Sequence, residues 1–213
     1  MRIYAVTPIH VDAGELARRQ ARYDALCPPG LTVRLYDIGE RAPRALNTED
    51  EVRSSEAFVV EALNDAPAEY DALMPDCVLD PGVAMLAHTA ARPVLGLLRI
   101  SLGWSVCTGR TTGAVARNSA IADEMVRVVE AYGWGDLFTG VEVLDLGVDA
   151  IADSTAWNHA VEAAQRRLGE AGSSVVVNGC SAVDVTTARA GSTPRLVDPT
   201  ALALRLVAAG EVA

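Results

Sequence analysis

The sequence predicts an α/β fold with mainly parallel strands, arranged as two similar halves that face each other across a cleft. Short apolar runs rich in β-branched residues alternate along the whole chain with longer segments of helical periodicity, the pattern of an α/β fold. Half of the 213 residues are apolar, which is enough for a sizeable core, and only 5% are aromatic. We therefore expect a core built mainly from Ala, Val and Leu.

Turn-forming residues divide the first half into strands and helices. The first apolar run ends at Thr7-Pro8, and the first helix ends at Cys27-Pro28-Pro29-Gly30. Thr48 and Glu51 have the spacing of a capping box, which predicts a helix that begins after Thr48. The expected strands are Ile3 to Val6, Leu31 to Tyr36, Tyr70 to Cys77 and Pro93 to Leu97, and the expected helices are about Gly14 to Leu26, Thr48 to Leu63 and a short one through Met85 and His88.

The second half is expected to open with a strand from Trp104 to Thr108, followed by a loop of small residues from Gly109 to Gly113. Asn118 and Ser119 lie near the start of the next helix, where such residues act as caps. The further expected elements are helices at about Ala116 to Tyr132 and Ser154 to Leu168, strands at Val141 to Leu146 and Ser174 to Val177, and a last strand and helix at Arg195 to Val197 and Pro199 to Ala209.

Charge and cysteine usage exclude several classes of function. The chain has 18 basic and 28 acidic residues, a net charge of −10, and no basic run, so we expect it to bind neither nucleic acid nor an anionic membrane. The N-terminal segment lacks the shape of a signal peptide and no apolar run is long enough to span a bilayer, which favours a cytoplasmic location. The four cysteines are then free thiols. The three scattered histidines and the lack of a Cys-x-x-Cys pair argue against a zinc site.

Cys77 and Cys180 both follow an apolar strand and precede turn-forming residues, whereas Cys27 and Cys107 are interpreted as packing residues. Ligands bind at the carboxyl ends of strands in open parallel sheets, so one thiol is expected on each wall of the cleft. Two such thiols suit stereoinversion at carbon. One thiolate removes a proton from one face, and the other thiol supplies a proton to the opposite face. The dipoles of helices expected after both cysteines would stabilise the thiolate.

Other polar residues near the predicted strand ends allow more than one interpretation. Asp80 is expected to hold the loop after Cys77 through an Asx-type turn. Thr108 and Ser181 can donate hydrogen bonds to a substrate carboxylate or enolate, or serve only as cap or turn hydroxyls. The loop Gly109 to Gly113 lacks the Gly-Lys-Ser/Thr ending of a phosphate-binding loop. The chain contains no lysine, which excludes a Schiff base, and the two-thiol chemistry requires no cofactor.

Four motifs, taken in order, resemble the aspartate/glutamate/hydantoin racemase superfamily. The segment Asp76-Cys77-Val78-Leu79-Asp80-Pro81-Gly82 is similar to the Cys-x-x-Asp-Pro-Gly segment of hydantoin racemases. Pro93-Val94-Leu95-Gly96 is similar to the Pro-Val-x-Gly strand that follows it in that family. Trp104 to Thr108 resembles the strand that opens the second half, and Val175 to Ser181 resembles the second cysteine motif, an apolar run that ends in Gly-Cys.

The resemblance implies two Rossmann-like (flavodoxin-like) parallel-sheet domains related by pseudo-twofold symmetry, with the active site in the cleft between them. Residues 1–97 plus 194–213 would form the first domain and residues 98–193 the second. Cys77 and Cys180 carry over as the acid/base pair of a cofactor-independent racemase or epimerase, expected to be a homo-oligomer that acts on an amino-acid-derived or hydantoin-like small molecule. The substrate-binding residues implied are Thr7, Ile9, His10, Val78, Asp80, Thr108, Gly109 and Ser181.

Departures from the family's motifs narrow the alternatives. The loop Thr7 to His10 replaces an Asn-Pro-Asn loop and lacks both asparagines, so His10 and backbone N–H groups are the expected replacements. The second motif reads Gly-Cys-Ser-Ala, unlike the Gly-Cys-Thr-His of glutamate racemases. Arylmalonate decarboxylases keep only the second cysteine, so Cys77 argues against decarboxylation. A maleate-type cis-trans isomerase with a cysteine nucleophile and a non-catalytic small-molecule-binding protein both stay open.

Overall fold

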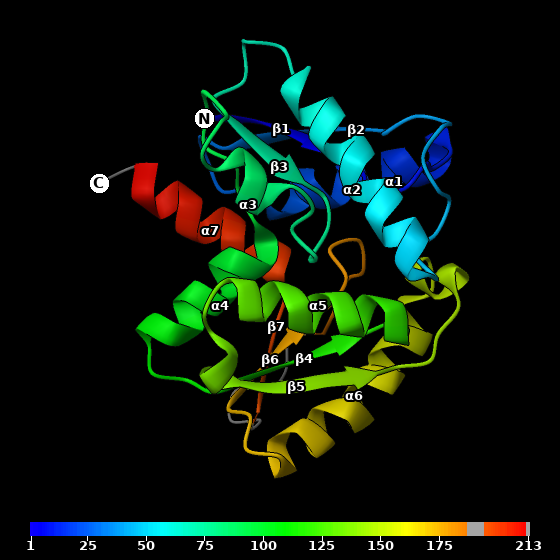
Figure 1. Ribbon diagram of the computed structural model, residues 1–213, viewed down its shortest axis with the longest axis vertical. Coiled ribbons are helices and arrows are strands. Elements are labelled where there is room, and N and C mark those ends of the chain that lie inside the picture. The colour runs from blue at the N-terminus through cyan, green and yellow to red at the C-terminus, as the bar shows by residue number, and fades with distance from the viewer. Residues whose placement is uncertain (187–193, 212–213) are drawn as a thin grey trace.

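The structure is a computed structural model that describes residues 1–186 and 194–211. These residues form two parallel β-sheets with helices around them, one sheet in each half of the molecule (Figure 1). The predicted α/β fold with two parallel-sheet halves is confirmed.

The first half contains β1 (Arg2–Val6), α1 (Ala13–Leu26), β2 (Thr32–Tyr36), α2 (Glu49–Asn64), β3 (Ala72–Pro75) and α3 (Val83–Leu86). The remaining elements are α4 (Leu97–Cys107), β4 (Thr112–Ala116), α5 (Ser119–Ala131), η1 (Gly135–Leu137), β5 (Phe138–Val143), η2 (Val148–Ile151), α6 (Ser154–Glu170), β6 (Val175–Asn178), β7 (Arg195–Val197) and α7 (Pro199–Glu211).

Both sheets are covered on two faces, as parallel sheets require. The first sheet has the strand order β2-β1-β3 and the second has the order β5-β4-β6-β7. Side chains of β1 alternate between two cores: Ile3 and Ala5 pack with side chains of α1 and α7, whereas Val6 packs with side chains of α2. This alternation explains why the strand is apolar almost throughout.

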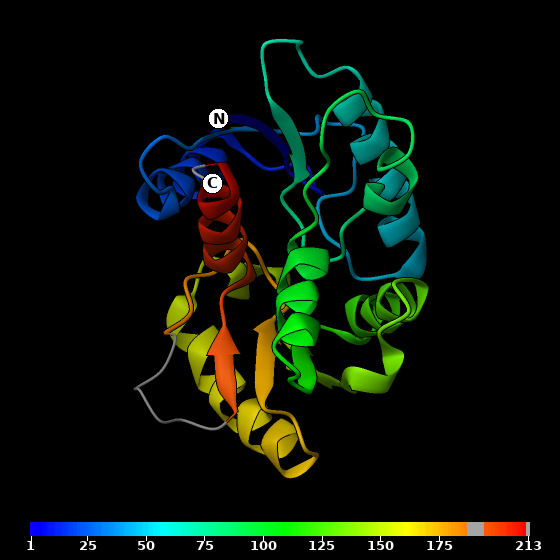
Figure 2. The ribbon, with the colours of Figure 1, turned by 90° about the vertical axis from the view of Figure 1, so that its left-hand side faces the viewer.

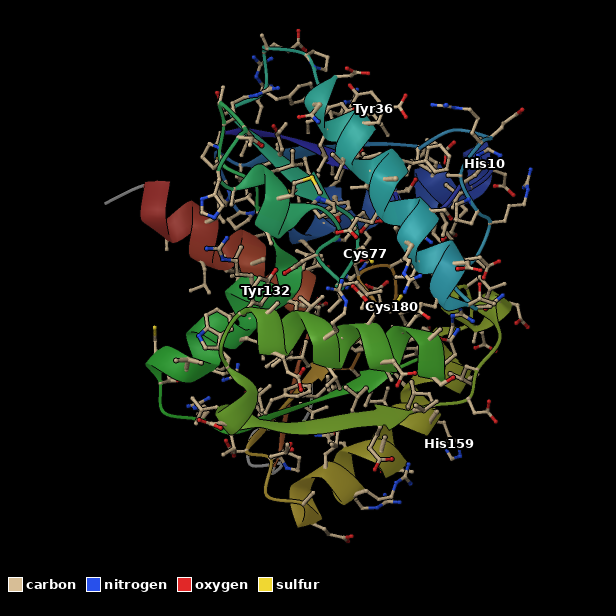
Figure 3. The ribbon with its side chains drawn as sticks, viewed as in Figure 1. His10, Tyr36, Cys77, Tyr132, His159 and Cys180 are labelled. Atoms are coloured by element: carbon tan, nitrogen blue, oxygen red, sulfur yellow. The ribbon has the colours of Figure 1, made fainter. Side chains whose placement is uncertain are left out.

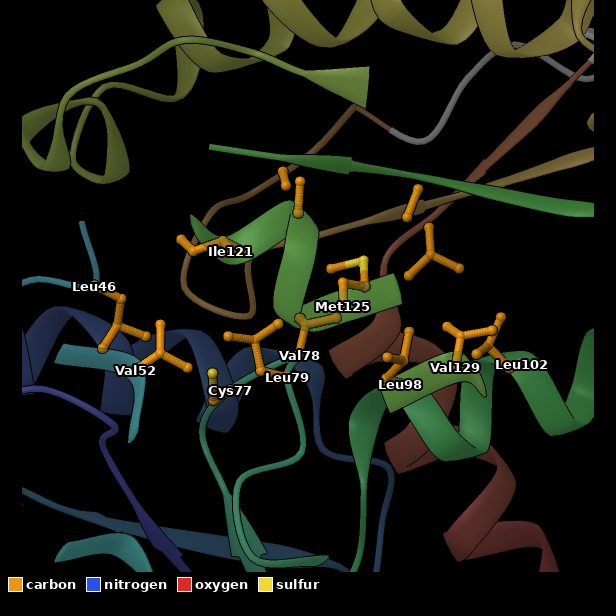
Figure 4. Packing of buried hydrophobic residues seen from close by; sticks show 14 of the residues in the cluster. Leu46, Val52, Cys77, Val78, Leu79, Leu98, Leu102, Ile121, Met125 and Val129 are labelled. Carbon is orange, nitrogen blue, oxygen red and sulfur yellow. The ribbon is translucent and has the colours of Figure 1, made fainter. Parts of the chain in front are cut away.

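A shared hydrophobic cluster joins the two halves (Figure 4). The first half contributes residues from the loops after its three strands and from α2, and the second half contributes the buried faces of α4 and α5 and residues of β4 and β6. The labelled members are Leu46, Val52, Cys77, Val78, Leu79, Leu98, Leu102, Ile121, Met125 and Val129. Because this apolar surface is removed from water only when the halves are in contact, it stabilises their relative placement.

The last two elements belong to different halves. β7 pairs with β6 in the second sheet, whereas α7 packs against α4 and α1 beside the first sheet (Figure 2). The expected domains, residues 1–97 plus 194–213 and residues 98–193, stay a prediction. β7 lies in the segment 194–213 expected in the first domain, but it pairs with the sheet of the second half. Within the described ranges, no helix combines the length and apolar character needed to cross a membrane.

The expected caps at Thr48 and Asn118 are confirmed, although α5 begins at Ser119 and not at about Ala116. Thr48 accepts a hydrogen bond from the backbone N–H of Glu51, and the Glu51 carboxylate accepts one in return from the N–H of Thr48. Asn118 accepts a hydrogen bond of 2.9 Å from the N–H of Ile121 and so caps α5. Both caps satisfy N–H groups that have no partner within the helix.

Two expected strands near the middle of the chain are wrong. Val94 makes only an isolated parallel bridge to Leu73, and the chain enters α4 at Leu97. The segment from Trp104 to Thr108 is the end of that helix and the turn after it. The buried positions of α4 are 97, 98, 101, 102 and 105, which follow the helical period and not the alternation of a strand.

The strand that opens the second sheet is β4, which begins inside the expected loop of residues 109–113 and ends at Ala116, where a helix was expected. All five of its residues are buried. Its glycine suits this crowded position, because a Cβ on Gly113 would lie 2.7 Å from the hydroxyl oxygen of Ser173. Small residues that look like a loop in the sequence thus mark a tightly packed central strand.

Candidate active site

Cys77 and Cys180 occupy equivalent positions in the two halves. Cys77 lies two residues after the end of β3, and Cys180 lies two residues after the end of β6. Both cysteines stand in the space between the sheets, where Figure 3 shows them near each other. They line one cavity, which contains about 530 Å³ of empty space, part of it open to solvent. Two thiols from different sheets therefore border the same cavity.

A backbone N–H group supports each thiol in the same way. The N–H of Leu79 serves Cys77 and the N–H of Ala182 serves Cys180, each from two residues further along the chain, and each lowers the pKa of its thiol. The helix dipoles expected after both cysteines are not the source of this support. Turns follow Cys77 until the short α3, and residues 181–186 form a turn and irregular backbone.

The Gly-Cys pair of the second half has a steric cause. A Cβ on Gly179 would lie 1.9 Å from the carbonyl oxygen of Val115, so the neighbouring strand leaves room only for glycine. Asn178 then holds Cys180, since its side-chain amide donates a 2.7 Å hydrogen bond to the carbonyl of Cys180. The Asn178 side chain is itself held by the indole N–H of Trp157 at 2.9 Å. The backbone that carries Cys180 is therefore firmly positioned.

The two thiols differ in their electrostatic surroundings. Burial raises the pKa of both thiols. Asp76 raises the pKa of both thiols further. At Cys180 the guanidinium groups of Arg19 and Arg22 oppose this rise, whereas at Cys77 the side chain of Asp80 adds to it. A thiolate therefore forms more readily at Cys180 than at Cys77.

Apolar side chains form most of the cavity wall, and two arginines add positive charge. The principal apolar residues are Ile9, Leu46, Val78, Leu79, Ile121 and Trp157. Arg19 reaches the cavity while paired with Glu15 at 2.7 Å and Asp76 at 3.2 Å. Arg117 lines the same cavity directly after β4. Among the described residues, no group of three or more His, Cys, Asp or Glu side chains is arranged to hold a metal ion.

The family model for Asp/Glu/hydantoin racemases matches residues 17–207, nearly the whole chain. The chain belongs to the Asp/Glu/hydantoin racemase family. Its structure is similar to the allantoin racemase from Klebsiella pneumoniae, with a TM-score of 0.78, 18% identity, and coverage of 100% of this chain and 88% of that one. For the allantoin racemase from Pseudomonas fluorescens the TM-score is 0.79, with 14% identity over 98% of this chain and 90% of that one. An uncharacterized protein of Schizosaccharomyces pombe, C1F7.10, is 26% identical over 74% of this chain and 68% of its own length.

Three of the expected substrate-binding residues of this racemase-family protein line the cavity. Ile9 and Val78 form part of its apolar wall, and Ser181 lies beside Cys180. The hydroxyl of Ser181 already donates a hydrogen bond to the carbonyl of Asp76. The Ser181 hydroxyl therefore links the two halves at the edge of the cavity. This is a structural role, the alternative to donating a hydrogen bond to the substrate.

Thr7 and His10 stand behind the cavity wall and not on it. Thr7 is fully buried, and its hydroxyl accepts a hydrogen bond from the N–H of Ile38. The Nδ1 atom of His10 lies 2.7 Å from the carboxylate of Asp37, and Figure 3 shows His10 well away from the two cysteines. Both residues shape the loop that presents Ile9 to the cavity.

Asp80 binds backbone N–H groups, as expected, but at the start of α4 and not in an Asx-type turn of its own loop. Its carboxylate accepts hydrogen bonds from the backbone N–H groups of Leu98 at 3.0 Å and Arg99 at 2.7 Å, and from the hydroxyl of Tyr132 at 2.9 Å. The first two are free N–H groups at the start of α4. Gly96 leaves space for this contact, since a Cβ there would lie 2.5 Å from the Asp80 carboxylate.

Thr108 and Gly109 lie apart from the cavity. Both are exposed at the end of α4, where the Thr108 hydroxyl donates a 2.9 Å hydrogen bond to the carbonyl of Trp104. We expected them at the site because residues 104–108 were predicted to be a strand. Since the strand is β4, the residue at the strand end is Arg117, and we do not carry Thr108 or Gly109 into the proposed site.

Two arginines that line the cavity, Arg19 and Arg117, are absent from the residues expected at the site. Arg19 lies three residues after Leu16 and four before Tyr23 on the face of α1 that packs inward, so helical spacing could have identified it. Arg117 follows a buried strand and precedes the helix cap, the position at which ligand-binding residues gather in parallel sheets. Correct placement of β4 would have revealed it.

Proposed function

We propose that this protein is a racemase or epimerase in which Cys77 and Cys180 exchange a proton with opposite faces of one substrate carbon. The observation that carries the proposal is the placement of two thiols, each at a strand end of a different sheet, on one largely apolar cavity. Membership of the racemase family supports it. Inversion needs a base and an acid on opposite sides of the carbon, and two opposed walls of a cavity supply both.

The charge states of the thiols suggest a direction for the proton transfer. The Cys180 thiolate, favoured by Arg19, removes the proton from the substrate carbon. The Cys77 thiol, kept protonated beside Asp76 and Asp80, delivers its proton to the opposite face. After this turnover Cys180 is the thiol and Cys77 the thiolate, so the other enantiomer is processed by the reverse exchange. No cofactor takes part in this mechanism.

The surroundings of the thiols suit a weakly acidic C–H bond. Burial raises the pKa of both thiols, which makes each thiolate a stronger base. The N–H groups of Leu79 and Ala182 lower the pKa of the thiols and so offset part of the rise that burial causes. The apolar wall limits the access of water, which would otherwise exchange protons with the intermediate.

The proposed substrate is a small molecule with an acidified C–H next to a carbonyl group. Amino-acid derivatives and hydantoin-like rings are the compounds of this class that the family and its allantoin racemase relatives suggest. A homo-oligomeric state, a cytoplasmic location and the absence of a nucleic-acid partner stay predictions.

Proton exchange in deuterated water tests the proposal. NMR follows deuterium at the α-carbon of a panel of amino acids and 5-substituted hydantoins. We expect Cys77→Ser and Cys180→Ser each to lower the rate of inversion by about 10²–10⁴-fold, the usual contribution of a general acid or base. Cys107→Ser is the matched control, because that thiol is exposed at the end of α4.

Full turnover in either active-site variant would contradict the two-base mechanism. A mass adduct on a single cysteine after incubation with an unsaturated diacid would point to the cis-trans isomerase instead. Binding of a small molecule without any exchange, together with ordinary pKa values for both thiols, would indicate a non-catalytic binding protein.

A further inference from the structure

Arg117 places a guanidinium without a carboxylate partner on the wall of the cavity. The residue is only 4% exposed. Its guanidinium donates hydrogen bonds to the carbonyl of Leu46 at 3.0 Å, to the side-chain oxygen of Asn47 at 3.0 Å and to the carbonyl of Leu146 at 3.3 Å. All three acceptors are neutral. Within the described ranges no carboxylate forms an ion pair with this side chain.

The other two buried arginines of the described residues are each paired with two carboxylates. Arg19 pairs with Glu15 and Asp76, and Arg22 pairs with Asp184 and Asp198. The chain has 28 acidic residues, so the unpaired state of the third arginine does not reflect a shortage of counter-charges. Burying an unpaired charge is strongly unfavourable unless another group compensates it. A buried cation that borders a cavity is therefore suited to a counter-charge from a ligand.

Apart from the two thiols, the charged side chains that line the cavity are Arg19, Asp76 and Arg117. Arg19 and Asp76 form an ion pair, whereas Arg117 forms none with a carboxylate in the part of the chain that the structure describes, and its charged surroundings are Cys180, Glu51 and Asp149. Its position relative to Cys180 follows from the sheet. Val115 of β4 pairs with Asn178 of β6, and both functional residues lie two positions further along their parallel strands. Arg117 and Cys180 are thus neighbours at the same end of the second sheet.

We infer that Arg117 is the anion-binding, specificity-determining residue of this cavity and that the substrate carries a carboxylate next to the reacting carbon. Three of the five N–H donors of Arg117 are taken by Leu46, Asn47 and Leu146, so the Nε–H and one Nη1–H remain to donate to a carboxylate, whose charge strengthens the contact. The neighbouring carbon would then face Cys180. The cation would also stabilise the negative charge that develops as the proton leaves.

This inference rests on the proposed function and narrows its substrate class. Small carboxylates are favoured over neutral hydantoin rings. The apolar wall formed by Ile9, Val78 and Ile121 fits an uncharged side group on the same carbon.

A matched pair of ligands tests the inference. An N-carbamoyl amino acid carries a free carboxylate, and ring closure with loss of water converts it into the neutral hydantoin with the same side group. Calorimetry on the Cys77→Ser/Cys180→Ser protein measures binding of both without turnover. We expect Arg117→Gln to weaken binding of the open acid roughly tenfold to a hundredfold, the usual effect of losing a charged hydrogen-bonding partner. The same substitution should change binding of the hydantoin by less than about threefold. Arg117→Lys keeps the charge, so its affinity for the open acid should lie between that of the unaltered arginine and that of Arg117→Gln.

A purely structural role must be separated from ligand binding, because Arg117 also connects the second half to Leu46 and Asn47. Asn47→Ala removes one of these contacts and keeps the cation, so it should retain binding of the open acid. Equal weakening of both ligands by Arg117→Gln, or an equal loss in Asn47→Ala, would overturn the inference. Should Arg117→Gln fail to fold, calorimetry on the protein that keeps Arg117 still tests the inference. Tighter binding of the hydantoin than of its open acid would also overturn it.

Deuterium exchange on the same ligand pairs separates the two proposals. Exchange on hydantoins alone, unaffected by Arg117→Gln, would reject the carboxylate inference and leave the racemase function standing. Binding of the open acids through Arg117 without exchange on any compound would reject the racemase function and leave the anion site. Exchange on open acids that is lost in Arg117→Gln supports both.

Discussion

The hydroxyl of Ser181 donates a hydrogen bond of 2.9 Å to the backbone carbonyl of Asp76. Ser181 follows Cys180 and Asp76 precedes Cys77, so the bond joins the two cysteine segments directly although they lie 105 residues apart along the chain. Both partners are buried. The separation of the two thiols therefore depends on this contact between the halves as well as on the fold of each half.

Ser181→Ala should lower the rate of proton exchange more than it raises KM, because the thiols lose a fixed spacing while the cavity wall remains. The buried carbonyl of Asp76 is left without this donor, at a cost of about 1–3 kcal/mol in the free energy of unfolding. Urea unfolding and NMR exchange rates measure the two effects. Ser101→Ala is the control, since its buried hydroxyl donates to a carbonyl within α4. Unchanged exchange in Ser181→Ala would contradict the spacing argument.

The two thiols should titrate in a fixed order, with Cys180 below Cys77. Burial raises the pKa of both, and only Cys180 has Arg19 as an opposing neighbour. Alkylation of Cys180 in Cys77→Ser should therefore begin at lower pH than alkylation of Cys77 in Cys180→Ser. Because a thiolate is required and its pKa is raised, kcat/KM should increase as pH rises above neutrality. A reversed order of alkylation would reject Cys180 as the starting base.

Gly179→Ala should abolish exchange and destabilise the fold. The new Cβ would overlap the carbonyl oxygen of Val115, so the segment that carries Cys180 must move away from β4. We expect a loss of about 2 kcal/mol or more, as for other overpacked core positions. Gly210→Ala is the matched control, since nothing lies within 4 Å of a Cβ there and alanine favours the helix. Wild-type exchange in Gly179→Ala would show that the steric argument is wrong.

Asp80→Ala should destabilise the protein by about 3 kcal/mol, because the first N–H groups of α4 and the Tyr132 hydroxyl lose a shared acceptor. Asp80→Asn keeps one side-chain oxygen and should lose less. Tyr132→Phe removes one donor and leaves the helix start intact, so its effect should be the smallest of the three. Thermal and urea unfolding rank the variants. If Tyr132→Phe were the most destabilised variant, the start of α4 would not be the main group that Asp80 stabilises.

Elements that are fixed by neighbours close in the chain could be predicted from the sequence, and elements that are fixed by distant residues could not. Thr48 and Asn118 cap helices through neighbours three residues away, so their roles could be predicted. The segment from 104 to 108 was misread because apolar residues in a short window fit a strand or a buried helix equally well. Only the pairing of β4 with β5 and β6 showed which segment is the strand.

The sequence by itself determined the α/β fold class, most helix and strand positions, and the two cysteines after apolar strands, because these follow from local periodicity and turn chemistry. The tertiary structure decided what surrounds those cysteines. The bond from Ser181 to Asp76, the pairing of Arg19 and the unpaired charge of Arg117 involve residues far apart in the chain. Their charge and hydrogen-bonding consequences exist only when packing brings the two sheets together, and no local pattern encodes them.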